Sequence, residues 1–404
     1  MAGKARADGE GSIYPYRSGF CAYVWVDTPG GEKKRKYVYG KTREDVHAKW
    51  LKLHQEAKQG PVSTRVPKLA PYLHYWLEEV IKPNRAPKTY VNYEVFTRLY
   101  INPFLGDRRL DRLNLREAQQ WVNKLPTVCQ CCAQGKDARR TKDKRRCCAI
   151  GKCCKQAPAG RTIKDIRDCL RGALNHAIRE ELIHRNVVAL VSLPTIRKPK
   201  RQRWSSDEAR TFLESAKNDH DPLYAAYVLI VVMGLREGEV LGLPVESIDF
   251  GNEELDISWQ LQRVQKELLH RQTKTPNSDD TLPLIDVVTA ALRGRIDRRN
   301  RDKAKAEGWV EEGLLFTTQY GTPIEPRNFL RSWTARCAKA GVGYITVHDG
   351  RHSCGSLLAD LDVHPRVAMR ILRHANFTVT MEVYTEVSSE QTRAALKKLG
   401  DSLR

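Results

Sequence analysis

The sequence lacks any long hydrophobic run. Its longest apolar segment, YAAYVLIVVMGL at residues 224–235, is shorter than the roughly 20 residues that a membrane-spanning helix requires. The N-terminal stretch MAGKARADGEGS is basic, but no apolar segment follows it as one would in a secretory signal. These absences predict no membrane partner and a chain that stays in the cytoplasm, with residues 224–235 as a buried helix.

Acidic residues are scarce relative to basic ones. Among 404 residues, 48 Asp and Glu stand against 69 Lys and Arg, for a formal net charge of +21, while 41% of residues are hydrophobic. A chain this long exceeds one ordinary domain, so a folded multidomain protein is expected. Its charge favours nucleic acid, because neutralising phosphates releases condensed counterions. Charge alone leaves ribosome-associated or anionic-membrane binding open.

Aromatic and β-branched residues alternate in residues 11–42, where the turn-like RSG and TPGGEKK interrupt them. This pattern predicts a three-stranded sheet. Thr42 and Asp45 then stand in capping-box spacing before a stretch with apolar residues at helical intervals. Residues 1–60 therefore form a small basic module of sheet plus helix. A strand-based DNA-binding module fits it, and a plain solubilising β-domain is the alternative.

Helical spacing of apolar residues resumes after the linker-like QGPVSTRVP and continues to about residue 192. Residues 66–192 are therefore expected to form a helical domain. Residues 193–203 combine prolines with basic residues, which indicates a linker able to lie along a phosphate backbone. Residues 204–404 are expected to form a mixed, mostly helical domain with short strands in ELDISW, LQRVQKEL and DTLPLI.

Seven cysteines fall within 26 residues, in CQCCAQGKDARRTKDKRRCCAIGKCC. They form three groups without any histidine: Cys129, Cys131, Cys132, Cys147, Cys148, Cys153 and Cys154. Structural zinc takes four ligands in tetrahedral array, commonly from separate turns, and a long polar loop inside a helical domain is uncommon unless something staples it. The pattern favours a zinc-stapled hairpin with a basic tip and four of these thiols as ligands. An oxidisable loop and a disulfide pair are the alternatives.

Several residues of the C-terminal half carry chemistry only in combination. Arg236 in MGLREGEVLGL precedes Glu239 by three residues, so the two share a helix face. Lys274 stands at the edge of a polar turn in QTKTPNSDDTLPL, and His374 and Tyr384 are separated by a short stretch in HANFTVTMEVY. Each residue alone has an ordinary structural explanation as an ion pair, a solvated charge or a core ring.

The segment TVHDGRHS adds a helix start. Thr346 and Asp349 have the spacing of a helix cap, which places His348 and Arg351 in the first turns on one face. A helix N-terminus that carries an arginine and a histidine favours an anion.

The order Arg, Lys, His-x-x-Arg, His, Tyr resembles the tyrosine recombinase family, in particular bacteriophage-type integrases. The resemblance covers most of the chain. It implies a multidomain, mostly α fold, in which the small N-terminal three-stranded sheet plus helix is an arm-type DNA-binding domain. The helical segment would be the core-site-binding domain with a Cys-rich insertion at residues 129–154. The remainder would be a mixed α+β catalytic domain with a C-terminal tail helix.

The resemblance also implies roles for single residues. Tyr384 would be the nucleophile that forms a 3′-phosphotyrosyl bond with DNA, and Glu239 a supporting residue. The phosphate-activating set would be Arg236, Lys274, His348, Arg351 and His374. Paired arginines stabilise the charge that gathers on an attacked phosphodiester without a metal, so no cofactor is expected for catalysis. Lys274 would supply the proton to the departing 5′ oxygen as general acid, and His348 would accept one.

Three positions depart from the family pattern. Gly350 replaces an apolar residue inside the His-x-x-Arg motif, Arg373 replaces a glycine before the later histidine, and SDD stands where basic residues often follow the lysine. None of these changes removes a group that the chemistry requires.

The expected function is site-specific integration or excision of a phage or mobile element. Its partners would be double-stranded DNA with paired attachment sites, three further protomers in a tetramer, and accessory DNA-bending or directionality proteins, in a bacterial cytoplasm near the nucleoid. The tail has apolar residues at helical spacing, namely Ala395, Leu396, Leu399 and Leu403. Such a helix could equally dock on a neighbouring protomer or pack back on its own domain. Alternatives are a type IB topoisomerase and a noncatalytic zinc-containing DNA-binding regulator.

Overall fold

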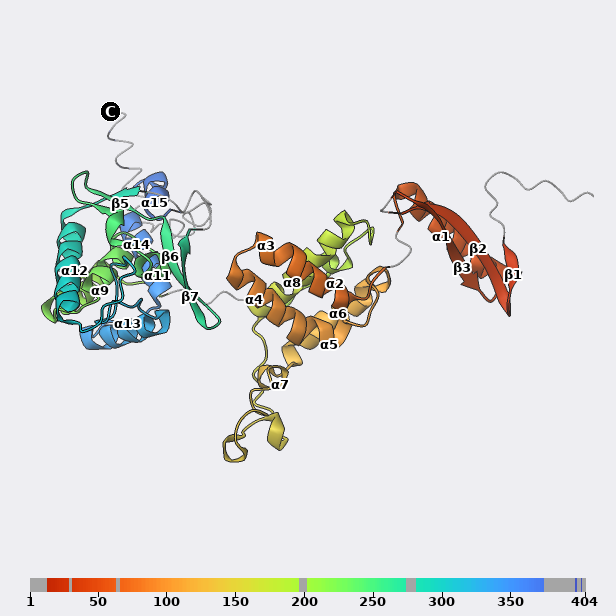
Figure 1. Ribbon diagram of the computed structural model, residues 1–404, viewed down its shortest axis with the longest axis horizontal. Helices are drawn as coiled ribbons and strands as arrows, with labels where there is room; N and C mark the ends of the chain where they lie inside the picture. The colour runs from red at the N-terminus through yellow and green to blue at the C-terminus, as the bar shows by residue number, and fades with distance from the viewer. Residues whose placement is uncertain are drawn as a thin grey trace, which may run out of the picture. The chain divides into compact units, whose positions relative to one another are not determined.

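The computed structural model describes residues 13–28, 31–62, 66–195, 202–273 and 281–373, with Lys397 and Asp401 (Figure 1). The chain divides into two compact units, residues 1–198 and 199–404. Both consist mostly of helices, accompanied by small antiparallel sheets, which confirms the expected fold class. No helix within the described ranges is long and apolar enough to cross a membrane.

The N-terminal module is a three-stranded antiparallel sheet packed on one helix. Its elements are β1 (Tyr14–Tyr16), β2 (Gly19–Asp27), β3 (Lys33–Gly40) and α1 (Arg43–Gln59). Strand alternation turns Ala22 and Val24 toward α1, whose Trp50 donates its indole N–H to the Tyr23 carbonyl at 3.1 Å. The Thr42 side chain accepts from the Asp45 N–H at 3.2 Å, which confirms the predicted helix start.

The helical domain follows, with one apolar core that includes Leu73, Ile101 and Leu170. Its helices are α2 (Leu69–Tyr75), η1 (Trp76–Ile81), α3 (Lys82–Asn84), α4 (Pro87–Phe96), η2 (Thr97–Ile101), α5 (Asn102–Leu105), η3 (Leu110–Arg112), α6 (Leu115–Lys124), η4 (Leu125–Thr127), α8 (Gly160–Arg179) and η7 (Val187–Leu190). The stretches η1 and η2 are π-helical and end two residues before Pro83 and Pro103, respectively. Proline removes an N–H from the helical ladder, and a widened turn accommodates that loss.

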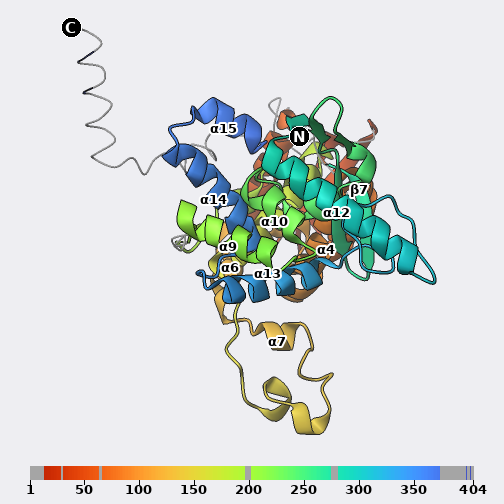
Figure 2. The ribbon, with the colours of Figure 1, turned by 90° about the vertical axis from the view of Figure 1, so that its left-hand side faces the viewer.

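The cysteine-rich insertion leaves this domain between η4 and α8. It contains α7 (Gln130–Ala133) and two 3-10 turns, η5 (Lys142–Lys144) and η6 (Cys148–Ile150). Figures 1 and 2 both show the chain around α7 projecting away from the helices of its own domain. Its base is closed by Gln130, whose backbone N–H donates to the Gln156 carbonyl at 2.8 Å and whose side chain donates to Ala157 O at 2.9 Å.

The C-terminal unit places helices around the buried α10 (Tyr224–Val231), in which Tyr227 to Ile230 are fully buried. Its other helices are α9 (Ser206–Asn218), α11 (Glu237–Leu241), η8 (Val245–Ser247), α12 (Asp286–Lys305), α13 (Pro326–Ala340), α14 (Val347–Asp360) and α15 (Pro365–Ile371). Helix α10 contacts α9, α12 and α14, as Figure 2 shows. Trp204 is buried against Phe212 and Trp333, so the chain is already inside this core at residue 204.

Two expectations about local structure need correction. The buried helix predicted for residues 224–235 ends at Val231, because Gly234 adopts a left-handed φ of 64°. The predicted strand LQRVQKEL is a hairpin of β6 (Trp259–Val264) and β7 (Glu267–Gln272), which reverses at Gln265 with φ 52°. The remaining strands, β4 (Ile248–Asp249), β5 (Glu254–Asp256) and β8 (Thr281–Pro283), form one antiparallel sheet.

Candidate functional site

Arg236 and Glu239 form the first part of the site, at the start of α11. Arg236 is the residue that caps the helix, and Glu239 lies one turn into it. The Glu239 carboxylate accepts the backbone N–H of Arg236 at 2.8 Å and its guanidinium at 2.5 Å. The predicted pairing is thus present, with the arginine at the helix start. Its side chain stays 40% exposed while that of Glu239 is 4% exposed, so the guanidinium is fixed yet open to the pocket.

Arg351 approaches from the second turn of α14. The predicted cap of this helix is confirmed, since Thr346 accepts from the Asp349 N–H at 3.1 Å. The Arg351 side chain is buried and donates to the backbone carbonyls of Gly234 and Leu372. Burial, and next the charge of Arg236, lower the pKa of Arg351 to about 9, so it remains protonated at neutral pH.

Gly350 explains one departure from the family pattern. A Cβ at this position would lie 2.9 Å from a ring atom of Trp333 and 3.3 Å from Ile230. The indole of Trp333 therefore fills the space that an apolar side chain at position 350 would need. Trp333 and Ile230 thus occupy the place of an apolar side chain at position 350.

Arg373 explains another departure. Its side chain is fully buried, it donates to the Glu239 carboxylate, and its carbonyl lies 3.5 Å from the Arg236 guanidinium. Burial alone would raise the pKa of Glu239, but the charges of Arg373 and Arg236 outweigh it and lower the pKa. Arg373 has a positive φ of 48°, a conformation that glycine adopts without strain. The arginine thus keeps a glycine-like backbone and adds a buried ion pair.

His348 lies at the mouth of the same pocket. It is exposed, and its Nε2 lies 3.2 Å from Nε2 of His352, one helical turn further along α14. The pocket is lined by Arg236, Glu239, His348 and Arg351, together with Leu235, Glu237, Gly238, Gln260, Leu261, Gln262, Arg263, Pro326 and Val347. Four residues predicted from the sequence therefore meet at one site, although Arg236 and Arg351 are 115 positions apart in the chain.

Three predicted site residues, Lys274, His374 and Tyr384, lie outside the described residues. Lys274 follows the hairpin β6–β7 in the sequence, and His374 follows Arg373 directly. The apolar positions of the expected tail helix, Ala395, Leu396, Leu399 and Leu403, also lie outside the described residues.

Sequence reasoning missed Glu237 and His352. Burial raises the pKa of Glu237 to about 7, and its Oε1 is buried without a hydrogen-bond partner among the residues that the structure describes. A carboxyl group with a shifted pKa inside a pocket is typical of functional sites. The repeated acid in LREGE and the second histidine in HDGRH were the available signals.

Comparison with known proteins identifies the family of this chain. Residues 202–391 match the Phage integrase family, and residues 68–125 match the phage integrase N-terminal SAM-like domain. The chain is a tyrosine recombinase of the phage integrase family. A XerC-like tyrosine recombinase of Caldanaerobacter subterraneus subsp. tengcongensis is 27% identical over 92% of this chain and 93% of its own length. An integrase of Streptomyces ambofaciens is 23% identical over 89% of this chain and 88% of its own length.

Solved structures share the recombinase fold. The Tn1549 transposon integrase in complex with transposon right end DNA superposes with a TM-score of 0.62 at 20% identity, covering 83% of this chain and 100% of that one. A lambda integrase tetramer bound to a Holliday junction gives a TM-score of 0.53 at 18% identity, covering 95% of this chain and 99% of that one. At these identities the likeness concerns the fold.

The recombinase also brings its insertion cysteines together. Cys129, Cys147, Cys148 and Cys153 form one group, and Cys131, Cys147 and Cys154 form a second that shares Cys147. Cys132 and Cys148 are paired in a disulfide. Of the alternatives open from the sequence, the structure thus contains both a disulfide pair and a cluster with metal-ligand spacing.

Proposed function

We propose that this tyrosine recombinase cuts and rejoins DNA at paired attachment sites, with Tyr384 as the nucleophile. The observation that carries the proposal is the pocket in which Arg236, Arg351 and His348 converge. An arginine pair held by a carboxylate and by backbone carbonyls is a preorganised cradle for a phosphodiester. The relatives named above are integrases and recombinases, which favours recombination over relaxation by a topoisomerase and over a noncatalytic regulator.

The chemical step follows from these groups. The Tyr384 oxygen attacks phosphorus in line and forms the 3′-phosphotyrosyl bond, while the bond to the 5′ oxygen breaks. Arg236 and Arg351 stabilise the charge on the non-bridging oxygens, with His374 as a further donor. His348 accepts the tyrosine proton, and Lys274 gives one to the departing 5′ oxygen. Because the linkage energy is retained, a second 5′-hydroxyl reverses the step and seals the exchanged strand without ATP.

Glu239 has a positioning role in this scheme. Its carboxylate binds Arg236 and Arg373, so it orients one phosphate-binding arginine and anchors the residue that precedes His374. No group in the scheme is a metal or an organic cofactor. A metal in the cysteine-rich insertion would be structural.

The remaining domains would bind DNA. Residues 1–60 are proposed as the arm-type module because the sheet face opposite α1 exposes Trp25, Tyr37 and Tyr39, and Arg35 stacks on the Trp25 ring at 4.8 Å. Basic and aromatic side chains on a sheet suit a DNA groove. Residues 66–192 would bind the core site, residues 193–203 would link the domains, and residues 204–404 would carry catalysis.

The assembly would contain four protomers on two paired sites, with the tail helix docking on its own domain or on a neighbour. Accessory DNA-bending or directionality proteins would bias the reaction. The setting would be the nucleoid of a bacterial host.

The test uses a nicked substrate that carries the junction sequences of the element encoding the chain. Wild type is expected to form a covalent protein–DNA adduct that survives denaturing electrophoresis, because the nicked strand diffuses away and traps the phosphotyrosine. Tyr384→Phe is expected to form none. Tyr344→Phe is the matched control, since Tyr344 is exposed and lies outside the pocket. No adduct from wild type, or an undiminished adduct from Tyr384→Phe, would overturn the assignment.

A further inference from the structure

The cysteine-rich segment, residues 129–158, has almost no apolar core. Between residues 130 and 157 the buried residues are Cys131, Asp137 and Cys147. These three side chains bury too little apolar surface to offset the backbone entropy of a segment of this length. Its order therefore depends on polar contacts and on its sulfur atoms.

Asp137 organises the backbone next to the cysteines. Its carboxylate accepts the N–H groups of Arg146 and Cys147 at 2.9 Å and of Ala149 at 3.1 Å. It also pairs with the Arg140 guanidinium at 2.9 Å. The turn that carries Cys147 is thus fixed by a buried carboxylate with four partners, which presents the neighbouring sulfur atoms in a set geometry.

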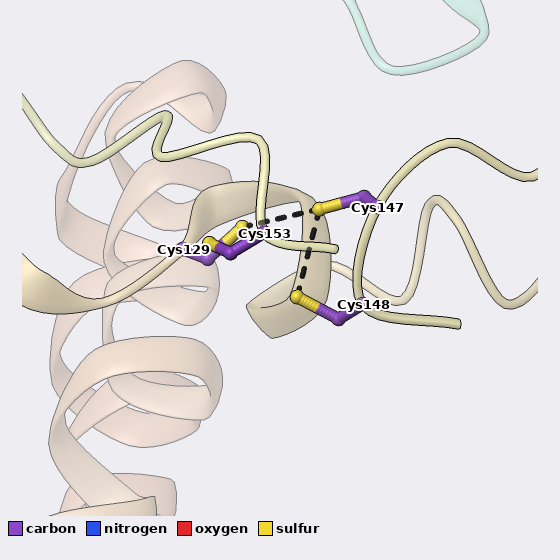
Figure 3. Close-up of side chains that lie close together, drawn as sticks. All are labelled: Cys129, Cys147, Cys148 and Cys153. Atoms are coloured by element: carbon purple, nitrogen blue, oxygen red, sulfur yellow. Dashed lines mark hydrogen bonds between the residues drawn. The ribbon is translucent and has the colours of Figure 1, made fainter. Parts of the chain in front are cut away.

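Four sulfur atoms converge from three parts of the segment, as Figure 3 shows for Cys129, Cys147, Cys148 and Cys153. All four lie within 4.8 Å of one another. The Cys129 and Cys147 sulfurs are 3.7 Å apart, and those of Cys147 and Cys148 are 3.5 Å apart. Four thiolates around zinc at about 2.3 Å form a tetrahedron with edges of about 3.8 Å. The observed spacing is close to that edge.

Backbone N–H groups also point at the sulfurs. The Cys154 N–H donates to Sγ of Cys147 at 3.1 Å, and the Lys155 N–H donates to Sγ of Cys153 at 3.3 Å. Hydrogen bonds of this kind favour the charged thiolate and orient it as a ligand. Basic side chains such as Lys152 and Lys155 lie nearby in the sequence, which offsets the charge of four thiolates.

We propose that Cys129, Cys147, Cys148 and Cys153 bind one structural Zn²⁺ ion that closes the base of this segment. Soft thiolates select zinc among the common divalent ions, and four protein ligands leave no open position for catalysis. The ion joins the start, the middle and the end of the insertion. It thereby holds the basic stretch at residues 136–146 as a defined loop.

The disulfide between Cys132 and Cys148 and this zinc site exclude each other, because Cys148 cannot be both oxidised and a ligand. Protein thiols are kept reduced where cellular DNA is processed; this one step rests on the proposed function. The zinc form is therefore the reduced, working state of the segment. The cross-linked form belongs to metal-free protein.

The group Cys131, Cys147 and Cys154 is the competing assignment, and it offers three thiolates. The two groups share Cys147 alone, so single substitutions separate them. Cys148→Ser and Cys153→Ser remove ligands of the four-cysteine site, whereas Cys131→Ser and Cys154→Ser remove ligands of the competing group.

The experiment measures metal in the full chain, purified with a thiol reductant and without chelator. Elemental analysis is expected to find about one zinc per chain in wild type, Cys131→Ser and Cys154→Ser. Zinc is expected to be lost from Cys147→Ser, Cys148→Ser and Cys153→Ser. If Cys148→Ser and Cys153→Ser keep their zinc while Cys131→Ser or Cys154→Ser loses it, the assignment is overturned. Wild type that takes up no added Zn²⁺ would also overturn it.

A second measurement needs no variants. Titrating folded wild type with a mercurial reagent is expected to release zinc in step with about four thiols, and Co²⁺ in its place is expected to show a tetrahedral thiolate spectrum. Thiols that react without metal release, together with a Cys132–Cys148 cross-linked peptide in reduced preparations, would overturn the proposal. The DNA adduct of Tyr384 is assayed separately, so either proposal can fail while the other stands.

Discussion

The catalytic pocket and the cysteine-rich segment hold polar groups in place by different means. Arg351 in the pocket and Arg373 behind Glu239 are charged yet almost fully buried, and the apolar core around α10 supports the elements that carry them. The cysteine-rich segment has no such core. A large core can therefore support buried charges provided each charge has partners, whereas a segment without a core needs a cross-link or a metal.

Glu239→Gln is expected to have the largest effect, because it removes the charge that Arg373 and Arg236 share. Arg373 would keep a fully buried positive charge without its carboxylate. Breaking a buried pair in this way costs about 3–5 kcal/mol, so the C-terminal unit should unfold at markedly lower denaturant concentration. Chemical denaturation of the whole chain, with Glu246→Gln at an exposed position as control, measures the difference.

Arg373→Gly sharpens this prediction. Glycine relieves the positive φ of 48° and leaves Glu239 paired with Arg236, so the loss of stability should be about 1–2 kcal/mol smaller than for Glu239→Gln. Equal losses for the two variants would contradict the view that an uncompensated arginine, rather than the missing contact, dominates the cost.

Metal removal should affect the cysteine-rich segment and leave the C-terminal unit unchanged. Chelation of the zinc-loaded protein is expected to open the cysteine-rich segment, because few other contacts order it. Limited proteolysis should then cleave within residues 134–158 many times faster, while the unfolding midpoint of the C-terminal unit stays unchanged. Protein loaded with zinc again should regain protection. Cleavage at the same rate with and without chelator would show that polar contacts such as those of Asp137 suffice.

Local signals explain how much of this was predictable from the sequence. The cap formed by Thr346 and the pair of Arg236 with Glu239 depend on residues three apart, so spacing alone revealed them. The ion pair of Arg373 with Glu239 joins positions 134 apart, and a positive φ at an arginine leaves no trace in composition. Its role therefore required the fold. The number of thiols was visible in the sequence, but which four converge depends on the turn that Asp137 fixes.

Glu237→Gln is expected to have the smallest effect, and that effect should change with pH only between about 4.5 and 7. The carboxyl group of Glu237 has its pKa raised by burial from 4.5 to about 7, so the folded state binds a proton that the unfolded state has lost. Stability from this group is therefore present below about pH 4.5 and is lost as the pH rises through about 7.

The variant should lack that loss, since glutamine stays neutral. The difference in unfolding temperature between Glu237→Gln and wild type should grow in favour of the variant from pH 4.5 to pH 7 and then level off. Glu246→Gln, which changes the same group at an exposed site, should show a flat difference over the same range. A flat difference for Glu237→Gln as well would mean that this carboxyl titrates normally, and that the pocket holds its charges through the arginines alone.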